Sequence, residues 1–230
     1  MTRNMAQPEF VDYDIGKSDD GGLLRLNFTI KDGTKCSPSY VQWTLGGAGV
    51  TKAPICFRDT GKLEQDALNY ETTAMEQDYY INGPIQADLF VSSTVQDAVV
   101  SVRVDEVTPK GQVNPLTNGL LLASARAVNE TRSRFVMGEM VQPYHYFTES
   151  MAQLLVPGEV VKMQVEIFPT SALIRKGNKL RISISPSNQA QGLLNLPRRE
   201  LTKGGITTIH NSPQFPSSVV LLAVPTSELN

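Results

Sequence analysis

The sequence predicts an all-β protein, and three observations support this fold class. Apolar and polar residues alternate with a period of two in several stretches, which places one face of each stretch in a core and the other in water. Turn-forming residues (Gly, Pro, Asn and Asp) separate these stretches. No long stretch repeats its apolar residues as an amphipathic helix would. The pattern indicates a β-sandwich or β-barrel with roughly nine or ten short strands.

The clearest alternation lies between Pro157 and Ser185. Apolar residues occupy every second position in Met163–Ile167 (MQVEI) and again in Leu180–Ile184 (LRISI). Between them, Arg175–Asn178 (RKGN) contains Gly and Asn, which tolerate the positive φ of a chain reversal. We therefore expect two long, half-buried strands that form the central hairpin of an antiparallel sheet.

The other strands are expected in short stretches bounded by turn signals. Asp32-Gly33 is a strong hairpin signal, Asn82–Pro84 divides two strands, and Pro109–Gly111 closes a turn. In chain order, the expected strands are Gly22–Ile30, Ala67–Met75, Tyr79–Ile81, Pro84–Ser92, Ala98–Val107, Gly119–Ala127 and Ser217–Val224.

The chain is expected to hold one domain behind a short tail. Residues 1–21 are polar and irregular, so we expect a solvated N-terminal tail. Residues 22–230 then form a single β-sandwich domain, because no second set of strands or helices is visible. Within it, residues 129–157 are less regular, and residues 186–217 are expected to be a long irregular stretch.

Charge and composition exclude several classes of partner. The formal charge of −2 gives no electrostatic reason to bind nucleic acid, and Arg198-Arg199 lacks interleaved aromatic residues. No apolar run approaches the ~20 residues that span a bilayer. The first residues lack the apolar segment of a signal peptide, so a cytoplasmic protein without a membrane partner is expected. Cys36 and Cys56 lack Cys-x-x-Cys spacing and are expected to be buried and reduced.

Two patterns that resemble ligand sites are incomplete. Asp12 and Asp14 have the spacing with which a calcium loop begins, but Gly16 and Lys17 stand where a ligand and the glycine should be. The glycine-rich Gly46–Gly49 has neither the Walker lysine and hydroxyl nor the spacing of a dinucleotide fingerprint. We therefore expect no cofactor and no metal site.

No catalytic residues can be assigned from the residues themselves. A Gly-x-Ser-x-Gly nucleophile elbow is absent from the sequence. His145 and His210 have no local partner, and a packed, hydrogen-bonded ring explains each more simply. Asp105 and Glu106 are neighbours on an expected strand, so they point to opposite faces and cannot act on one substrate. The chain alone is expected not to be an enzyme.

A series of motifs occurs in a characteristic order over roughly residues 44–225. Individually each motif is weak, but their order and spacing together are specific. The motifs are Thr44–Gly47 (TLGG), Gln65–Thr72 (QDALNYET), Ile81–Pro84 (INGP), Val104–Gly111 (VDEVTPKG), Asn118–Arg126 (NGLLLASAR), Pro157–Glu159 (PGE), Val165–Ala172 (VEIFPTSA), Lys176–Ile182 (KGNKLRI) and Pro216-Ser217.

This order resembles the C-terminal, non-catalytic domain of the X-Pro dipeptidyl-peptidase and cocaine-esterase/NonD (CocE/NonD) hydrolase family. The chain departs from the family pattern at Lys110, Leu122, Asn178 and Lys179. The resemblance implies a jelly-roll β-sandwich related to galactose-binding domains. It also implies that the Ser-His-Asp triad lies upstream, in an α/β-hydrolase domain, and no triad motif maps onto these residues.

The resemblance favours one function and leaves an alternative. In the first, the chain is the accessory domain of a dipeptidyl-peptidase or esterase. It packs on an α/β-hydrolase domain, in cis or on a separate chain, and shapes the active-site entrance or homo-oligomer contacts. Such a domain should expose a large apolar patch. The alternative is a carbohydrate-binding module, whose stacking candidates are Trp43, Tyr79, Tyr80, Tyr144 and Tyr146.

Overall fold

The computed structural model describes residues 3–6, 15–16, 25–26, 67–186 and 199–229 of the chain. The expected strand at residues 22–30 falls within this part only at Arg25-Leu26. The predicted Asp32-Gly33 turn, the glycine-rich stretch, both cysteines and the Asp12–Asp14 pattern lie outside the described residues.

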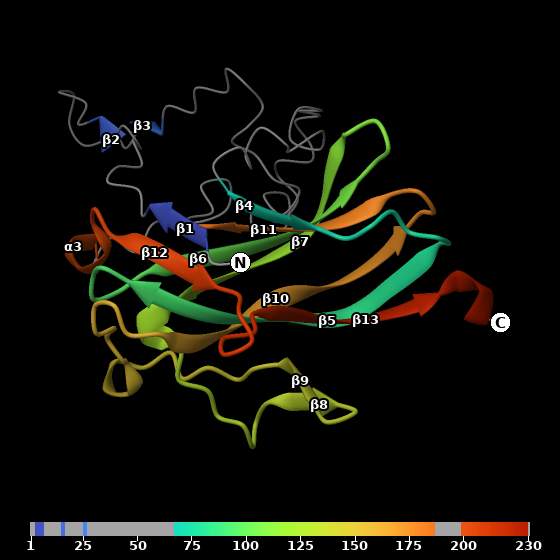
Figure 1. The fold of residues 1–230 in the computed structure, drawn as a ribbon. Coiled ribbons are helices and arrows are strands. Elements are labelled where there is room, and N and C mark those ends of the chain that lie inside the picture. The colour runs from blue at the N-terminus through green and yellow to red at the C-terminus, as the bar shows by residue number, and fades with distance from the viewer. Residues whose placement is uncertain (1–2, 7–14, 17–24, 27–66, 187–198, 230) are drawn as a thin grey trace.

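Two antiparallel sheets stack face to face as a sandwich (Figure 1), so the predicted all-β fold class is confirmed. The finer assignment to a jelly roll of the galactose-binding type stays a prediction. One sheet has the order β1-β12-β5-β10, with β13 also paired to β5, and the other has the order β4-β11-β6-β7. Their strands are β1 (Arg3–Ala6), β4 (Leu68–Glu71), β5 (Tyr79–Ser93), β6 (Val99–Val107), β7 (Val113–Leu122), β10 (Val161–Ile174), β11 (Lys179–Ser185), β12 (Ile206–His210) and β13 (Ser218–Pro225).

Smaller elements complete the described chain. Two short strand pairs lie outside the main sheets, and the only α-helix among the described residues has four residues. These elements are β2 (Ile15–Gly16) with β3 (Arg25–Leu26), β8 (Arg134–Val136) with β9 (Glu139–Gln142), the 3₁₀ turns Ala123–Ala125, Glu149–Met151 and Thr226–Glu228, and α3 (Arg199–Thr202).

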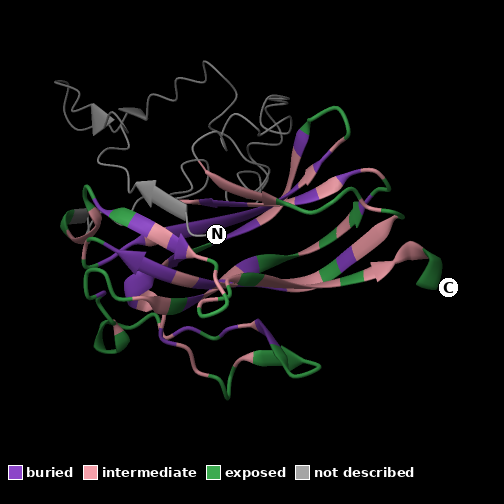
Figure 2. Ribbon diagram, viewed as in Figure 1, coloured by how far each residue is buried: buried purple, intermediate pink, exposed green. Residues whose placement is uncertain are grey.

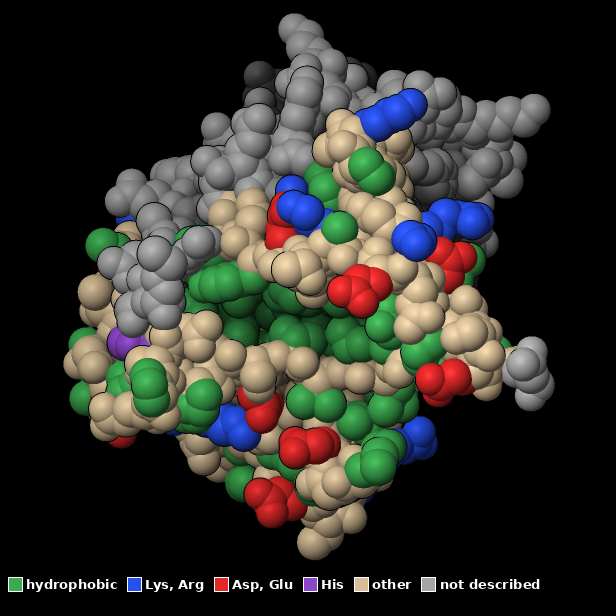
Figure 3. All heavy atoms as spheres, turned by 45° about the vertical axis from the view of Figure 1, so that its right-hand side comes forward, with side chains coloured by type: hydrophobic (Ala, Val, Ile, Leu, Met, Phe, Trp, Pro, Cys, Tyr) green, Lys and Arg blue, Asp and Glu red, His purple; other side chains and the backbone are tan. Residues whose placement is uncertain are grey.

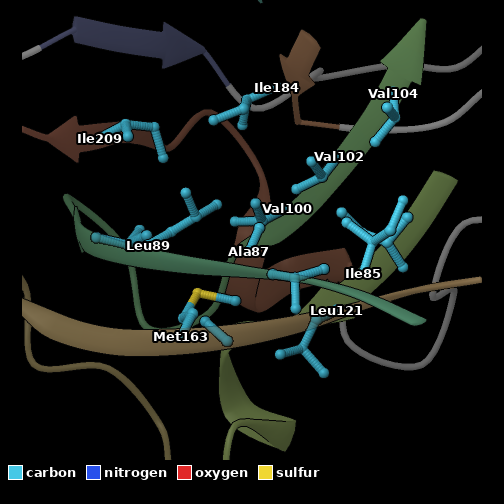
Figure 4. Packing of buried hydrophobic residues seen from close by; sticks show 14 of the residues in the cluster. Ile85, Ala87, Leu89, Val100, Val102, Val104, Leu121, Met163, Ile184 and Ile209 are labelled. Carbon is cyan, nitrogen blue, oxygen red and sulfur yellow. The ribbon is translucent and has the colours of Figure 1, made fainter. Parts of the chain in front are cut away.

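The hydrophobic core lies between the two sheets, where the alternating apolar residues meet (Figures 2 and 4). Every second side chain of β5, β6 and β10 points inward, and these side chains are almost completely buried. This burial supplies the main driving force for stacking the sheets. The inward residues are Ile85, Ala87, Leu89 and Val91 of β5, Val100, Val102 and Val104 of β6, and Met163, Val165 and Ile167 of β10.

The expected central hairpin is wrong, although both of its strands exist. β10 pairs with β5, from Val161 opposite Val91 to Ile174 opposite Tyr79, whereas β11 pairs with β4 and β6 in the other sheet. Arg175–Asn178 therefore carries the chain from one sheet to the other. Period-two alternation identifies the buried face of a strand but not its partner.

A carboxylate of β6 holds this corner between the sheets. Glu106 accepts hydrogen bonds from the Asn178 side-chain amide at 2.6 Å and from the backbone N–H of Arg175 at 3.3 Å. Gly177 has a φ of +84°, which favours glycine. The corner residues were recognised as turn residues from the sequence, but their turn joins two layers.

The predicted turn at Asn82–Pro84 is also wrong. β5 runs without interruption from Tyr79 to Ser93, so the two expected strands are one. Gly83 has a φ of +120°, and the register between β5 and β10 shifts near it, between Ile167 and Thr170. The Asn-Gly-Pro sequence thus marks an irregularity inside a long strand.

Other expectations differ from the structure at single elements. The expected strands at Ala98–Val107 and Ser217–Val224 are confirmed as β6 and β13. Residues 186–217 were expected to be irregular, yet they contain α3 and β12. Within the expected tail, β1 pairs along β12. The proposed boundary of the domain at residue 22 stays a prediction.

β7 and β10 approach each other so closely that the sandwich is closed at this edge. A Cβ atom added at Gly119 would lie 2.0 Å from the carbonyl oxygen of Glu166 and 2.9 Å from the Cα of Ile167. Nearby, the Thr117 hydroxyl donates a hydrogen bond to the backbone oxygen of Phe168 at 2.7 Å. Only a residue without a side chain permits this approach of two backbones.

We therefore expect Gly119→Ala to lower the free energy of unfolding by about 3 kcal/mol, because β7 and β10 must move apart. Urea unfolding of the chain measures this loss. Gly158→Ala is the matched control, since Gly158 has a φ of +85° but no atom within 4 Å of its added Cβ. It should cost only about 1 kcal/mol. Equal losses would contradict the proposed close approach.

Candidate docking surface

A long connection joins β7 to β10, and we call its residues 123–160 the crossover. It contains the β8–β9 hairpin and the 3₁₀ turns Ala123–Ala125 and Glu149–Met151. β9 contacts β5 and β13, so the crossover lies against the outward face of the five-stranded sheet (Figure 1). It supplies a further layer outside the sandwich.

The inner side of the crossover is buried and fastened mainly by side chains. Met140, Val141 and Leu155 are at most 8% exposed. The buried His145 donates from Nε2 to the backbone oxygen of Gln164 on β10, at 2.8 Å. The Gln142 amide likewise donates to the Glu166 carboxylate of β10 at 2.7 Å. His145 is thus packed and hydrogen-bonded, the simpler of its two interpretations.

Arg126 ties the two ends of the crossover together. Its Nη1 donates to the backbone oxygen of Ala123 at 2.9 Å and also to that of Gln153. Burial lowers the pKa of Arg126, while the nearby charges of Asp97 and Glu159 oppose this shift. The guanidinium therefore offsets its desolvation with two carbonyls and two carboxylates.

The outer side of the crossover is apolar. Thirteen large hydrophobic residues of the described chain are exposed, and eight of them lie within residues 135–156. Scattered exposed hydrophobics are ordinary, but their concentration in one segment makes this segment a candidate interaction surface. We call these eight residues the apolar strip: Phe135, Val136, Met137, Tyr144, Phe147, Met151, Leu154 and Val156.

The composition of this segment is that of a protein–protein interface. Residues 135–156 contain no Lys or Arg and only two acidic residues, Glu139 and Glu149, although 19% of the whole chain is charged. The same segment holds three of the seven methionines. Interface cores are depleted in charge and enriched in aromatic residues and Met. This signal is present in the sequence, but it belongs to no strand pattern and to no catalytic motif.

The outward face of the four-stranded sheet differs in character. Its residues are polar, yet Ser101, Asp105 and Ser183 are at most 2% exposed. Arg103 lies beside Asp105, at 3.4 Å between guanidinium and carboxylate. Because this face is already buried within the chain, it offers little surface to a separate partner.

The rim of that face carries an ion cluster. Glu71 of β4 accepts hydrogen bonds from Arg181 and from Lys179 of β11, at 2.5 Å and 3.0 Å for the shortest contacts. The hydrogen bond from Arg181, followed by that from Lys179, lowers the pKa of Glu71 below its ordinary value of 4.5. The cluster joins β4 to β11 at the edge of the sheet.

A second apolar feature is a hollow lined by hydrophobic side chains in the face shown in Figure 3. Several core-contacting residues also keep part of their surface exposed, including Leu68 and Tyr70 of β4 and Val219 and Leu221 of β13.

The structure brings together one serine–histidine pair that the sequence did not reveal. His210 of β12 lies 2.8 Å from the Ser92 hydroxyl of β5, measured from Nε2. Its ring packs against Phe215, and its backbone oxygen accepts a hydrogen bond from Ser217. Among the described residues no carboxylate is hydrogen-bonded to His210, as the orienting group of a triad would be.

The other sequence-derived site residues do not converge. Asp105 is buried beside Arg103, while Glu106 binds Asn178 at the corner, so the two carboxylates face opposite sides as predicted. Within the described ranges no three His, Cys, Asp or Glu side chains are grouped to hold a metal ion. The described chain also contains no helix long and apolar enough to cross a membrane.

Three of the four tyrosines proposed for sugar stacking contact other side chains of the chain. The Arg132 guanidinium lies 3.8 Å from the centre of the Tyr144 ring, and Tyr146 packs edge-on against Tyr144. The hydroxyl of Tyr80 is bonded to Ser171 at 2.6 Å. Trp43 lies outside the described residues. The carbohydrate-binding alternative is therefore not favoured.

Comparison with known proteins decides the family. The family model for the X-Pro dipeptidyl-peptidase C-terminal non-catalytic domain matches residues 16–220. The chain belongs to this family. The match includes the four-stranded sheet, most of the five-stranded sheet and the whole crossover, so the motifs of the sequence indicated the correct relatives.

The family's relatives are longer proteins. The chain is 24% identical over 221 residues to the cocaine esterase of a Rhodococcus species, covering 89% of this chain and 34% of that protein. A Mycobacterium bovis protein that carries the name serine esterase Mb1866c is 29% identical over 131 residues, covering 57% and 20%. The chain thus spans at most about a third of the curated relatives it matches.

Solved structures share the fold. A CocE/NonD family hydrolase from Staphylococcus aureus superimposes with a TM-score of 0.57 at 17% identity, over 73% of this chain and 32% of that one. An α-amino acid ester hydrolase gives 0.56 at 14% identity, over 76% and 29%. In both, the sandwich corresponds to about a third of a hydrolase chain.

Loss of the Arg126 side chain should loosen the crossover. In Arg126→Leu, the backbone oxygens of Ala123 and Gln153 lose their donor, at a cost of about 1–3 kcal/mol. Limited proteolysis should then cut within residues 150–156 faster than in the native chain. Arg134→Leu is the control, because Arg134 is exposed on the β8–β9 hairpin. Unchanged cleavage in Arg126→Leu would contradict its clamping role.

The Glu71 cluster should make stability depend on pH. Because the folded pKa is lowered, the carboxylate stabilises the fold above pH 4.5, and this contribution is lost as pH falls through the folded pKa. Glu71→Gln should therefore flatten the acid limb of a stability–pH profile, whereas Glu76→Gln should not. Since the cluster is partly exposed, 1 M salt should reduce the difference. A profile unchanged by Glu71→Gln would refute this role.

Proposed function

We propose that this chain is the accessory domain of a serine hydrolase and docks in cis on an α/β-hydrolase domain through the apolar strip. Residues 22–230 form the accessory domain in this proposal. The observation that carries it is the strip itself: an exposed apolar surface, in a segment with few charges, on a chain whose relatives are more than twice its length.

The crossover suits this role because it is much longer than the connection between β7 and β10 requires. β7 and β10 are in contact, so a short connection would join them, yet the chain places 38 residues (123–160) between them. Long connections in compact domains are commonly functional. The inner side of the crossover covers the five-stranded sheet, and its outer side remains available to a partner.

Catalysis in this proposal belongs to the partner domain. The complete protein hydrolyses an ester or an X-Pro peptide, the two reaction classes that the names of its family and relatives carry. This chain supplies no nucleophile, base or cofactor. Its contribution is to cover one side of the hydrolase domain and exclude water from the contact, which holds the active-site entrance in shape.

Methionine oxidation tests the docking without any substitution. In the isolated chain, brief peroxide treatment should oxidise the fully exposed Met137 fastest, Met151 next, and the buried Met163 least. In the protein expressed from its complete reading frame, Met137 and Met151 should react as slowly as Met163. Peptide mass spectrometry measures all three methionines in one sample.

Met140 is the internal control, because it lies in the same crossover but is buried against the sheet in either case. Equal oxidation of Met137 and Met151 in the isolated and complete proteins would show that the strip is not covered, and would overturn the docking proposal. Protection of Met140 alone would instead report a change inside the crossover and would also count against docking.

A further inference from the structure

The β8–β9 hairpin ends in a turn that its sequence does not favour. Val136 pairs with Glu139, which leaves Met137 and Gly138 as a two-residue loop. Both have positive φ, +52° and +88°, as a type I′ turn requires. Asn-Gly is the preferred pair for this turn, and Met137 is the only described non-glycine residue with positive φ.

Met137 is unfavourable here for two independent reasons. A side chain in the left-handed region brings its Cβ close to the carbonyl oxygen that follows it, which costs free energy. The same side chain is 100% exposed, so an apolar group stands wholly in water. No contact with the described chain compensates for either cost. Unfavourable backbone conformations that persist are concentrated at functional positions.

The base of the hairpin is firmly held, although its tip is exposed. The Ser133 hydroxyl donates to the backbone oxygen of Asn129 at 2.8 Å and accepts from the backbone N–H of Tyr144 at 2.9 Å. Arg132 stacks on the Tyr144 ring. The tip is therefore presented in a fixed position, away from both sheets (Figures 1 and 2).

We propose that this tip is the anchor of the docking surface. Met137 enters an apolar, uncharged recess of the hydrolase domain, and Phe135 and Val136 contact the rim of that recess. This inference rests on the proposed function. A preorganised tip loses little conformational entropy on binding, and the flexible thioether of Met adapts to the shape of an apolar recess. A few such residues supply most of the affinity of an interface.

Met137→Asn distinguishes an anchoring role of Met137 from a purely structural one. The substitution should stabilise the isolated chain but weaken docking in the complete protein. Asn tolerates positive φ, so the isolated chain should become more stable, with a Tm about 2 °C higher. In the complete protein, the same substitution removes the apolar side chain from the recess. Met151 should then be oxidised as fast as in the isolated chain.

Leu229→Asn is the matched control, since Leu229 is 52% exposed but lies beyond β13, outside the crossover. It should leave Met151 protected in the complete protein. If Met151 also stays protected in Met137→Asn, docking occurs but the hairpin is not its anchor, and the inference is overturned.

Two other results would overturn it by different routes. If Met151 is unprotected in the native complete protein, the proposed function itself fails, and the anchor fails with it. If Met137 of the isolated chain becomes protected as its concentration rises, while the complete protein gives no protection, the tip binds a second copy of this chain. In that case the partner of the tip is a second copy of this chain and not the hydrolase domain.

Discussion

The contact between β7 and β10 is the constraint on which the arrangement of the molecule depends. At Gly119 the two backbones meet without an intervening side chain, so one strand of each sheet closes the same edge of the sandwich. The core between the sheets is thereby complete at this edge. Because β7 and β10 lie so close together, joining them does not account for the length of the crossover.

The two outward faces of the sandwich are covered in contrasting ways. On the four-stranded sheet, buried polar residues such as Asp105 and Ser183 belong to a face closed within the chain. On the five-stranded sheet, the crossover provides the cover and moves the exposed surface outward by one layer. Within residues 135–156 that new surface is apolar, and only Glu139 and Glu149 are charged there. The contrast is consistent with docking of a partner on the side of the crossover, as proposed.

Much of the fold was predictable from the sequence, because alternation reports directly on burial. It located β6, β10, β11 and β13 and their inward residues. It did not reveal that β10 and β11 lie in different sheets, since pairing depends on residues far apart in sequence. β12 was missed because glycines and prolines flank its five residues. The crossover lacks period-two alternation because it adds no strand to either main sheet; His145 and Gln142 attach it to β10 through their side chains.

The long strand β5 has a consequence for how the chain reaches this structure. It pairs with β10 on one side and with β12 and β13 on the other, including Val91 with Ile209 and Tyr79 with Pro225. Partners more than a hundred residues apart give the sheet a high contact order, which slows folding. During synthesis, one edge of β5 stays without its strands until β12 and β13 have left the ribosome. A polypeptide that ends before β12 would therefore present an unpaired apolar edge, the usual starting point for aggregation.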